Sequence, residues 1–120
     1  MHTAETLKKY LHNFYHARVE NPWHKYPAFF VILHEHGKKW FGLIMTASEY
    51  TLGVSDDKEK LIDDINIKLD PRDVEFFKHQ PVFLPAYHMD KTHWVTVLLN
   101  GTVPDETLEK LIKTSHDLTE

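Results

Sequence analysis

Apolar residues recur along the chain with two different periods, which predict helices in some segments and strands in others. Near the N-terminus, Leu7, Leu11 and Phe14 follow helical spacing. This spacing predicts an amphipathic helix that extends to about Ala17, with Thr3 as its N-cap. The segment therefore buries one stripe of side chains and leaves the other in water.

Two further helices are predicted from their start signals. Asp70-Pro71 places a capping carboxylate before a proline at the first helical position, which predicts a short helix over residues 72–79. The last helix is predicted to begin near Pro104, because Asp105 and Glu106 then occupy its first turn, where the helix dipole favours anions.

Short apolar or alternating segments between turn residues predict the strands of a sheet. These segments cover residues 29–33, 39–46, 62–69, 83–88 and 93–99. The predicted order is α-β-β-β-α-β-β-α, which indicates an α+β fold, a two-layer sandwich with helices on one face of a mostly antiparallel five-stranded sheet. We expect a single domain over residues 1–120.

Alternation within the third predicted strand indicates which side chains face away from the helices. Ile65, Ile67 and Leu69 share one side, so Asn66 and Lys68 point to the other. We expect the apolar set to meet the helices. Asn66 and Lys68 are then expected on an open face of the sheet or at its rim.

The densest group of chemically active side chains is the run Pro85-Ala86-Tyr87-His88-Met89-Asp90-Lys91-Thr92-His93-Trp94. It places two histidines, a lysine and two large aromatic residues around one predicted turn. Lysines contact phosphates, an asparagine amide bonds to a base edge or sugar, and aromatic rings stack on bases. The candidate binding residues are Lys39, Asn66, Lys68, Tyr87, His88, Lys91, His93 and Trp94.

Each of these residues also has a purely structural interpretation. Tyr87 and Trp94 lie in near-continuous apolar strands, where aromatic residues more often belong to the core. His88 and His93 are equally suited to fixing the turn through hydrogen bonds. Exposed lysines keep a sheet face or edge soluble. The binding interpretation therefore depends on the cluster and not on any single residue.

The same run closely resembles the signature of the MmcQ/YjbR family of small bacterial proteins. Lys39-Trp40-Phe41-Gly42-Leu43-Ile44-Met45 and Ile65-Asn66-Ile67-Lys68-Leu69-Asp70-Pro71 resemble two further family segments, so the resemblance extends from about Phe29 to the C-terminus. It implies a compact α/β domain related to the frataxin-like and secretion-chaperone-like folds. It also implies DNA binding through two β wings.

Two positions depart from the family pattern. Asp90 stands where the family usually has asparagine, and Thr92 stands where a second lysine is common. A carboxylate at the tip of the turn repels phosphate, so the departure at Asp90 weakens the implied DNA binding for this chain.

Composition limits the function further. The chain has 120 residues, no cysteine and a formal net charge of -4, with a pI of about 6.2. The absence of cysteine excludes disulfides and thiol nucleophiles, and the net charge excludes the positive field of a strong nucleic-acid binder. Any DNA contact must therefore be local. Ten histidines can gain protons on mild acidification, which would shift the net charge toward positive.

Motifs for catalysis, metals and membranes are missing from the sequence. With four glycines there is no phosphate-binding loop or dinucleotide fingerprint. His34 and His36 share one strand face, but two histidines make half of a metal site. No apolar stretch approaches the roughly 20 residues that span a bilayer, and the N-terminus lacks the layout of a signal peptide. We expect no metal, no cofactor and a cytoplasmic location.

We interpret the chain as a non-enzymatic binding module, with DNA as the first candidate partner. The alternative is a module that binds a protein or a small ligand. Such a module would use an apolar surface around Trp23, Tyr26 and Trp40. Salt dependence distinguishes the two, because phosphate contacts weaken with added salt and apolar contacts do not.

Overall fold

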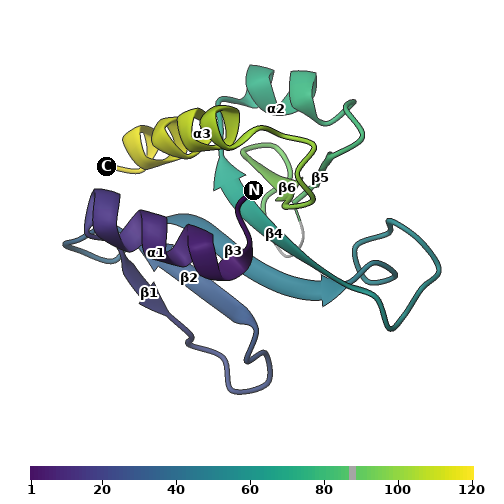
Figure 1. Ribbon diagram of the computed structural model, residues 1–120. Coiled ribbons are helices and arrows are strands. Elements are labelled where there is room, and N and C mark those ends of the chain that lie inside the picture. Colours follow the sequence, from purple (N-terminus) through teal and green to yellow (C-terminus); the bar gives the residue numbers. More distant parts are fainter. Residues whose placement is uncertain (87–88) are drawn as a thin grey trace.

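The computed structural model describes residues 1–86 and 89–120 and shows a sheet with its helices gathered on one side (Figure 1). The elements in chain order are α1 (Ala4–Tyr15), β1 (Arg18–Glu20), β2 (Phe29–Leu33), β3 (Trp40–Ser48), β4 (Leu61–Lys68), α2 (Pro71–Phe77), β5 (Phe83–Pro85), β6 (Trp94–Leu98) and α3 (Asp105–Leu118). Within the described residues the sheet has the strand order β1-β2-β3-β4-β6-β5, and every neighbouring pair is antiparallel.

The predicted α+β class, with helices on one face of an antiparallel sheet, is confirmed, but the predicted number of strands is wrong. The described sheet has six strands instead of five, because β1 pairs with β2 along Arg18↔Leu33 to Glu20↔Val31. His16, at φ 54, ends α1 in the left-handed region and turns the chain into this strand. A strand of three residues is too short to show a period of two in the sequence.

The helix starts follow the capping signals. Thr3 and Thr6 form a reciprocal capping box at α1, where the Thr3 hydroxyl accepts a hydrogen bond from the Thr6 N–H. Asp70 caps α2 by accepting from the Arg72 N–H at 2.9 Å, with Pro71 at the first helical position. These contacts satisfy N–H groups that the first turn of a helix leaves without intrahelical partners.

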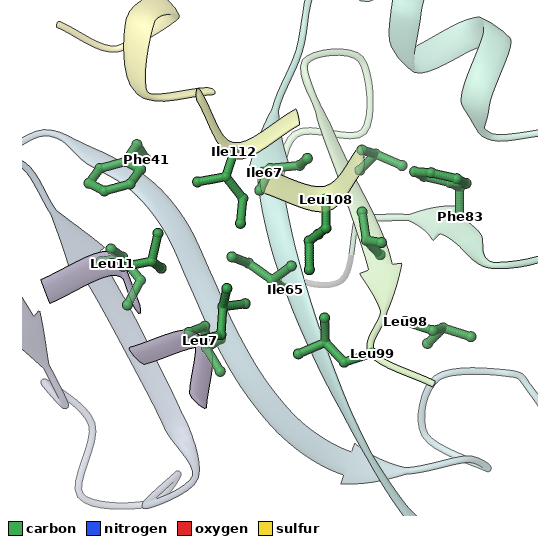
Figure 2. Close-up of a cluster of buried hydrophobic side chains, with 14 of the residues drawn as sticks. Leu7, Leu11, Phe41, Ile65, Ile67, Phe83, Leu98, Leu99, Leu108 and Ile112 are labelled. Atoms are coloured by element: carbon green, nitrogen blue, oxygen red, sulfur yellow. The ribbon is translucent and has the colours of Figure 1, made fainter. Parts of the chain in front are cut away.

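The main core lies between the helices and the sheet (Figure 2). Leu7 and Leu11 from α1 and Leu108 and Ile112 from α3 point toward the β4 side chains, and all are buried. The predicted inward set Ile65, Ile67 and Leu69 belongs to this core. Alternation along β4 therefore orients the strand as expected.

The opposite face of the sheet carries a second, smaller core. Val31, Leu33, Leu43 and Met45 form it, and Trp23 and Met89 from two connecting segments pack against it. This face is therefore largely covered, and the expectation that Asn66 lies on an open surface is wrong. Asn66 is 0% exposed, lies between Leu43 and Thr96 in the sheet, and accepts a hydrogen bond from the Thr96 hydroxyl.

A β-bulge in β3 decides which aromatic ring reaches this second face. Ile32 pairs with Gly42 and Leu33 pairs with Trp40, which leaves Phe41 as the extra residue. Phe41 accordingly turns into the main core, while Trp40 packs with the second one. If the same residues formed a regular strand with no bulge, strict alternation would place Trp40 on the helix side.

Ser115 of α3 joins β3 and β4 where their direct pairing ends. The pairing of β3 with β4 ends at Leu43↔Asn66. If the same register continued, Phe41 would pair with Lys68. Instead, the buried Ser115 hydroxyl accepts from the Lys68 N–H at 2.9 Å and donates to the Phe41 carbonyl at 2.7 Å. One side-chain oxygen thus replaces a direct bond between the strands, and the strands diverge here.

Replacing Ser115 by alanine should destabilise the fold by about 1–3 kcal/mol, because it leaves a buried N–H and a buried carbonyl without a partner. Urea unfolding measures this change. Thr114→Ala is the matched control, since Thr114 is half-buried and its hydroxyl donates to the Lys110 carbonyl of its own helix, so no contact between strands is lost. The control should stay within about 0.5 kcal/mol of the original protein. Equal effects of the two substitutions would contradict the bridging role.

Asp64 is a buried acid on the second face of β4. Its side chain is 0% exposed, and neither carboxyl oxygen has a hydrogen-bond partner among the described residues. Burial, and then the neighbouring Asp63 charge, raise the pKa of Asp64 well above its ordinary value. The folded protein therefore holds this side chain in its neutral form at a pH where the unfolded chain ionises it.

This raised pKa makes the fold less stable as the pH rises. Between the unfolded and folded pKa values the folded chain binds the extra proton, so the free energy of unfolding falls from about pH 4 upward until the folded pKa is passed. Asp64→Asn removes the titrating group and should flatten this part of the profile. Urea unfolding of both proteins from about pH 4.5 to 8 tests this, and parallel profiles would contradict it.

Candidate functional site

A hollow of about 410 Å³ opens where β3 and β4 diverge. We call it the lysine hollow, and it is lined by Lys38, Lys39, Trp40, Lys68, Trp94, Leu118 and Thr119. These residues come from the β2–β3 turn, the first residue of β3, the last of β4, the first of β6 and the end of α3. Four segments distant in sequence therefore form one surface.

Strand register and the bulge place the central residues of the hollow. Lys68 pairs directly with Trp94 across β4 and β6, so their side chains share the second face of the sheet. The bulge at Phe41 brings Trp40 to that same face from β3. Lys68, on the strand between β3 and β6, thus lines the hollow together with both tryptophans, at the strand ends beyond the buried Asn66.

In the part of the chain that the structure describes, acidic side chains do not pair with the lysines of the hollow. Among the described residues, no aspartate or glutamate side chain lies within 4.0 Å of the ammonium groups of Lys38, Lys39 or Lys68, whereas Lys8 and Lys113 pair with Glu5 and Asp117 at 2.7 and 2.9 Å. The Lys39 ammonium donates to the main-chain oxygen of Glu120, at 3.5 Å. The hollow is therefore a local cationic site on a chain of net charge -4.

The turn before β6 is held by hydrogen bonds to the Asp90 side chain. Its carboxylate accepts from the Thr92 N–H at 2.8 Å and lies 2.7 Å from Nδ1 of His93. The Thr92 hydrogen bond first, and then the one from His93, hold the pKa of Asp90 below its ordinary value. His93 thus fixes the turn, in agreement with its structural interpretation, while Lys91 is exposed beside it.

The eight predicted residues separate into four groups. Lys39, Lys68 and Trp94 line the lysine hollow. Lys91 and His93 lie in the adjoining turn, and Asn66 is buried beneath the surface. The remaining two, Tyr87 and His88, lie outside the described residues.

Sequence reasoning missed Lys38 and Trp40 as members of the lysine hollow. Lys38 adjoins the predicted strand start at residue 39, so the basic pair in the turn was a usable signal. No sequence signal indicated Trp40, because the direction of its side chain depends on a bulge that is visible only in the strand register.

An aromatic pocket of about 270 Å³ adjoins the lysine hollow. Its lining is Trp23, Tyr26, Phe29, Trp40, Leu43 and Met89. The Trp23 and Trp40 rings meet edge to face with centroids 5.7 Å apart, and Tyr26 stacks on Phe29 at 5.0 Å. The apolar set that the sequence indicated, Trp23, Tyr26 and Trp40, is therefore brought together, and Trp40 lines both cavities.

A third cavity, of about 660 Å³, lies around His34 and His116 at the end of α3. Their ring centroids are 4.3 Å apart, and Tyr15 stacks on His116 at 4.6 Å. Burial first, and then the His116 charge, lower the pKa of His34, and burial raises the pKa of Tyr15 to about 12. Nε2 of His34 lies 2.7 Å from the Thr119 hydroxyl.

The side chains of this region that could together hold a metal ion are not the pair His34 and His36. Among the described residues, the donor atoms that lie within 4.8 Å of one another belong to His116, Asp117 and Glu120. His36 is 91% exposed at the hairpin tip. The histidine pair noted in the sequence therefore does not supply this group.

The family model described as YjbR matches residues 12–118, which is nearly the whole chain. The chain belongs to the YjbR family. A curated relative, the uncharacterized protein YyaQ of Bacillus subtilis (strain 168), is 36% identical over 119 residues, which cover 99% of each chain.

Solved structures of similar proteins share the fold of this YjbR-family chain. The crystal structure of a Pseudomonas syringae protein has a TM-score of 0.89 at 34% identity and covers 97% of each chain. A Deinococcus radiodurans crystal structure has a TM-score of 0.73 at 26% identity, covering 98% of this chain and 78% of its own. In the described part of the YjbR-family chain, no helix has the length and apolar character to cross a membrane.

Proposed function

We propose that this YjbR-family protein is a non-enzymatic module that binds DNA through the lysine hollow. The observation that carries the proposal is a set of three lysines that have no aspartate or glutamate side-chain partner among the described residues and that line one hollow with Trp40 and Trp94. Ammonium groups contact phosphates, and indole rings stack on bases or wedge between them. Such a partner also implies a cytoplasmic location.

The size of the cationic site sets the expected affinity. Three hollow lysines, with Lys91 nearby, neutralise about three to four phosphates, so the logarithm of the affinity should fall with the logarithm of salt with a slope of roughly -2 to -4. This is a shallow dependence compared with that of strong DNA binders. We therefore expect weak binding that depends on a local patch and not on the field of the whole protein.

The chemistry of the lining favours binding over catalysis. The described lining of the lysine hollow offers ammonium groups, two indoles and the Thr119 hydroxyl, but neither a carboxylate nor an imidazole. General acid–base catalysis near neutral pH most often uses one of these two groups. The hollow is accordingly equipped to hold an anion rather than to move a proton.

A second candidate function is suggested by the aromatic pocket. A cavity lined by four aromatic rings, with Leu43 and Met89, suits an apolar group of a protein or of a small ligand. Binding of that kind would change little between low and moderate salt. Salt dependence therefore separates the second candidate from the first.

Lys68→Gln should weaken DNA binding and reduce the magnitude of the salt slope by about 1, because one phosphate contact is lost. Fluorescence anisotropy with a labelled DNA duplex and with one of its strands, between roughly 50 and 200 mM salt, measures both quantities. Lys9→Gln is the matched control, since Lys9 is an exposed lysine on α1, in the helical layer.

The control should bind as the original protein does. The proposal is wrong if the original protein binds neither DNA at the lowest salt. It is also wrong if Lys68→Gln and Lys9→Gln lose affinity equally, because the contact would then not be at the hollow.

Asp90→Asn should strengthen DNA binding roughly two- to fivefold at low salt, since like charges a few ångströms apart in water repel by about 1 kcal/mol or less. The amide oxygen of asparagine still accepts from the Thr92 N–H, so the turn should persist. Asp56→Asn makes the same change of charge at an exposed position in the β3–β4 connection. The same gain in both variants would indicate an effect of net charge alone.

A further inference from the structure

The aromatic pocket and the lysine hollow are two parts of one surface. Trp40 lines both, so an apolar cavity and a cationic one meet at a single indole ring. A ligand that spans this ring would need a flat apolar group attached to an anionic one. That combination is the chemistry of a nucleotide.

We infer that the aromatic pocket accepts one unstacked base of a single-stranded DNA segment whose phosphates lie on the lysine hollow. This inference rests on the proposed function and specifies the form of the DNA. In a duplex the bases are paired and stacked, so their faces are not available to a pocket. A single strand presents them freely.

The geometry of the pocket suits one ring system. Its volume of about 270 Å³ is slightly below the range of about 300–1,000 Å³ that holds drug-sized ligands. The Trp23 and Trp40 planes meet at 81°, so a flat base that stacks on one ring meets the edge of the other. Tyr26 is 47% exposed and packs on Phe29, which leaves part of its ring accessible from solvent.

The charge beside the pocket decides between possible occupants. An aromatic anchor from a protein partner would fit the rings but would make no use of the adjoining ammonium groups of Lys38, Lys39 and Lys68. A base of single-stranded DNA is always attached to a phosphate backbone. Stacking on aromatic rings tolerates every base, so the pocket confers a preference for single strands without a strong preference for sequence.

The test compares three fluorescently labelled DNAs of equal length in anisotropy titrations: a single-stranded oligothymidine of about ten nucleotides, the same backbone with abasic sites throughout, and a duplex. The oligothymidine should bind most tightly, by roughly 5- to 150-fold over the abasic strand, as expected for one stacked base. It should also quench tryptophan fluorescence, and the abasic strand should not.

Trp23→Leu should lower the affinity for oligothymidine by a similar factor and leave both the abasic strand and the salt slope unchanged. Because Trp23 also packs on the second core, a second variant keeps the test independent of folding. Tyr26→Leu should weaken oligothymidine binding, while Tyr50→Leu, which alters a tyrosine that is 51% exposed in the β3–β4 connection, should not.

The outcomes separate this inference from the proposed function. Equal affinity for oligothymidine and the abasic strand overturns the base pocket, and so does tighter binding of the duplex. If Lys68→Gln still weakens binding in either case, the proposed phosphate contact at the hollow is retained and the base pocket is rejected. If the original protein binds none of the three DNAs, both proposals are rejected.

Discussion

The Ser115 hydroxyl, between the Lys68 N–H and the Phe41 carbonyl, fixes the end of α3 into the sheet. Two strands that would otherwise continue their ladder diverge around it, and the surface that carries Trp40, Lys68 and Trp94 opens at that point. The cost of leaving buried backbone groups unpaired makes this contact specific, because no apolar residue of similar size replaces both hydrogen bonds. The fold and the candidate site therefore share one hydrogen-bonded junction.

The second face of the sheet is organised by increasing burial along the strands. At the strand ends lie Lys68 and Trp94, which both line the lysine hollow. The next pair, Asn66 and Thr96, satisfies its polar groups internally, and Asp64 beyond it is held neutral by burial. A polar stripe thus runs from surface to interior on one strand, and only its outer end is suited to contact a partner.

The sequence predicted the parts of the fold that depend on local signals. Helix caps act within a few residues, as at Thr3 and Asp70, and so does the strand alternation through Ile65 and Ile67. Both signals are therefore visible without the structure. Lys39, Lys68 and Trp94 could be selected from the sequence because they are cationic or aromatic residues near the predicted strand ends, and the structure places them around one hollow. The sixth strand, the burial of Asn66 and the direction of Trp40 were not predictable, because each depends on a partner distant in the chain.

The bulge at Phe41 has a consequence for how insertions and deletions would act on this chain. Successive side chains of a strand face opposite sides, so a deletion of the extra residue Phe41 would remove a ring from the main core and leave Trp40 opposite Leu33 on the second face. The length of β3 at residue 41 thus bears on the packing of the main core, while the ring between the two cavities depends on Trp40 and its pairing with Leu33.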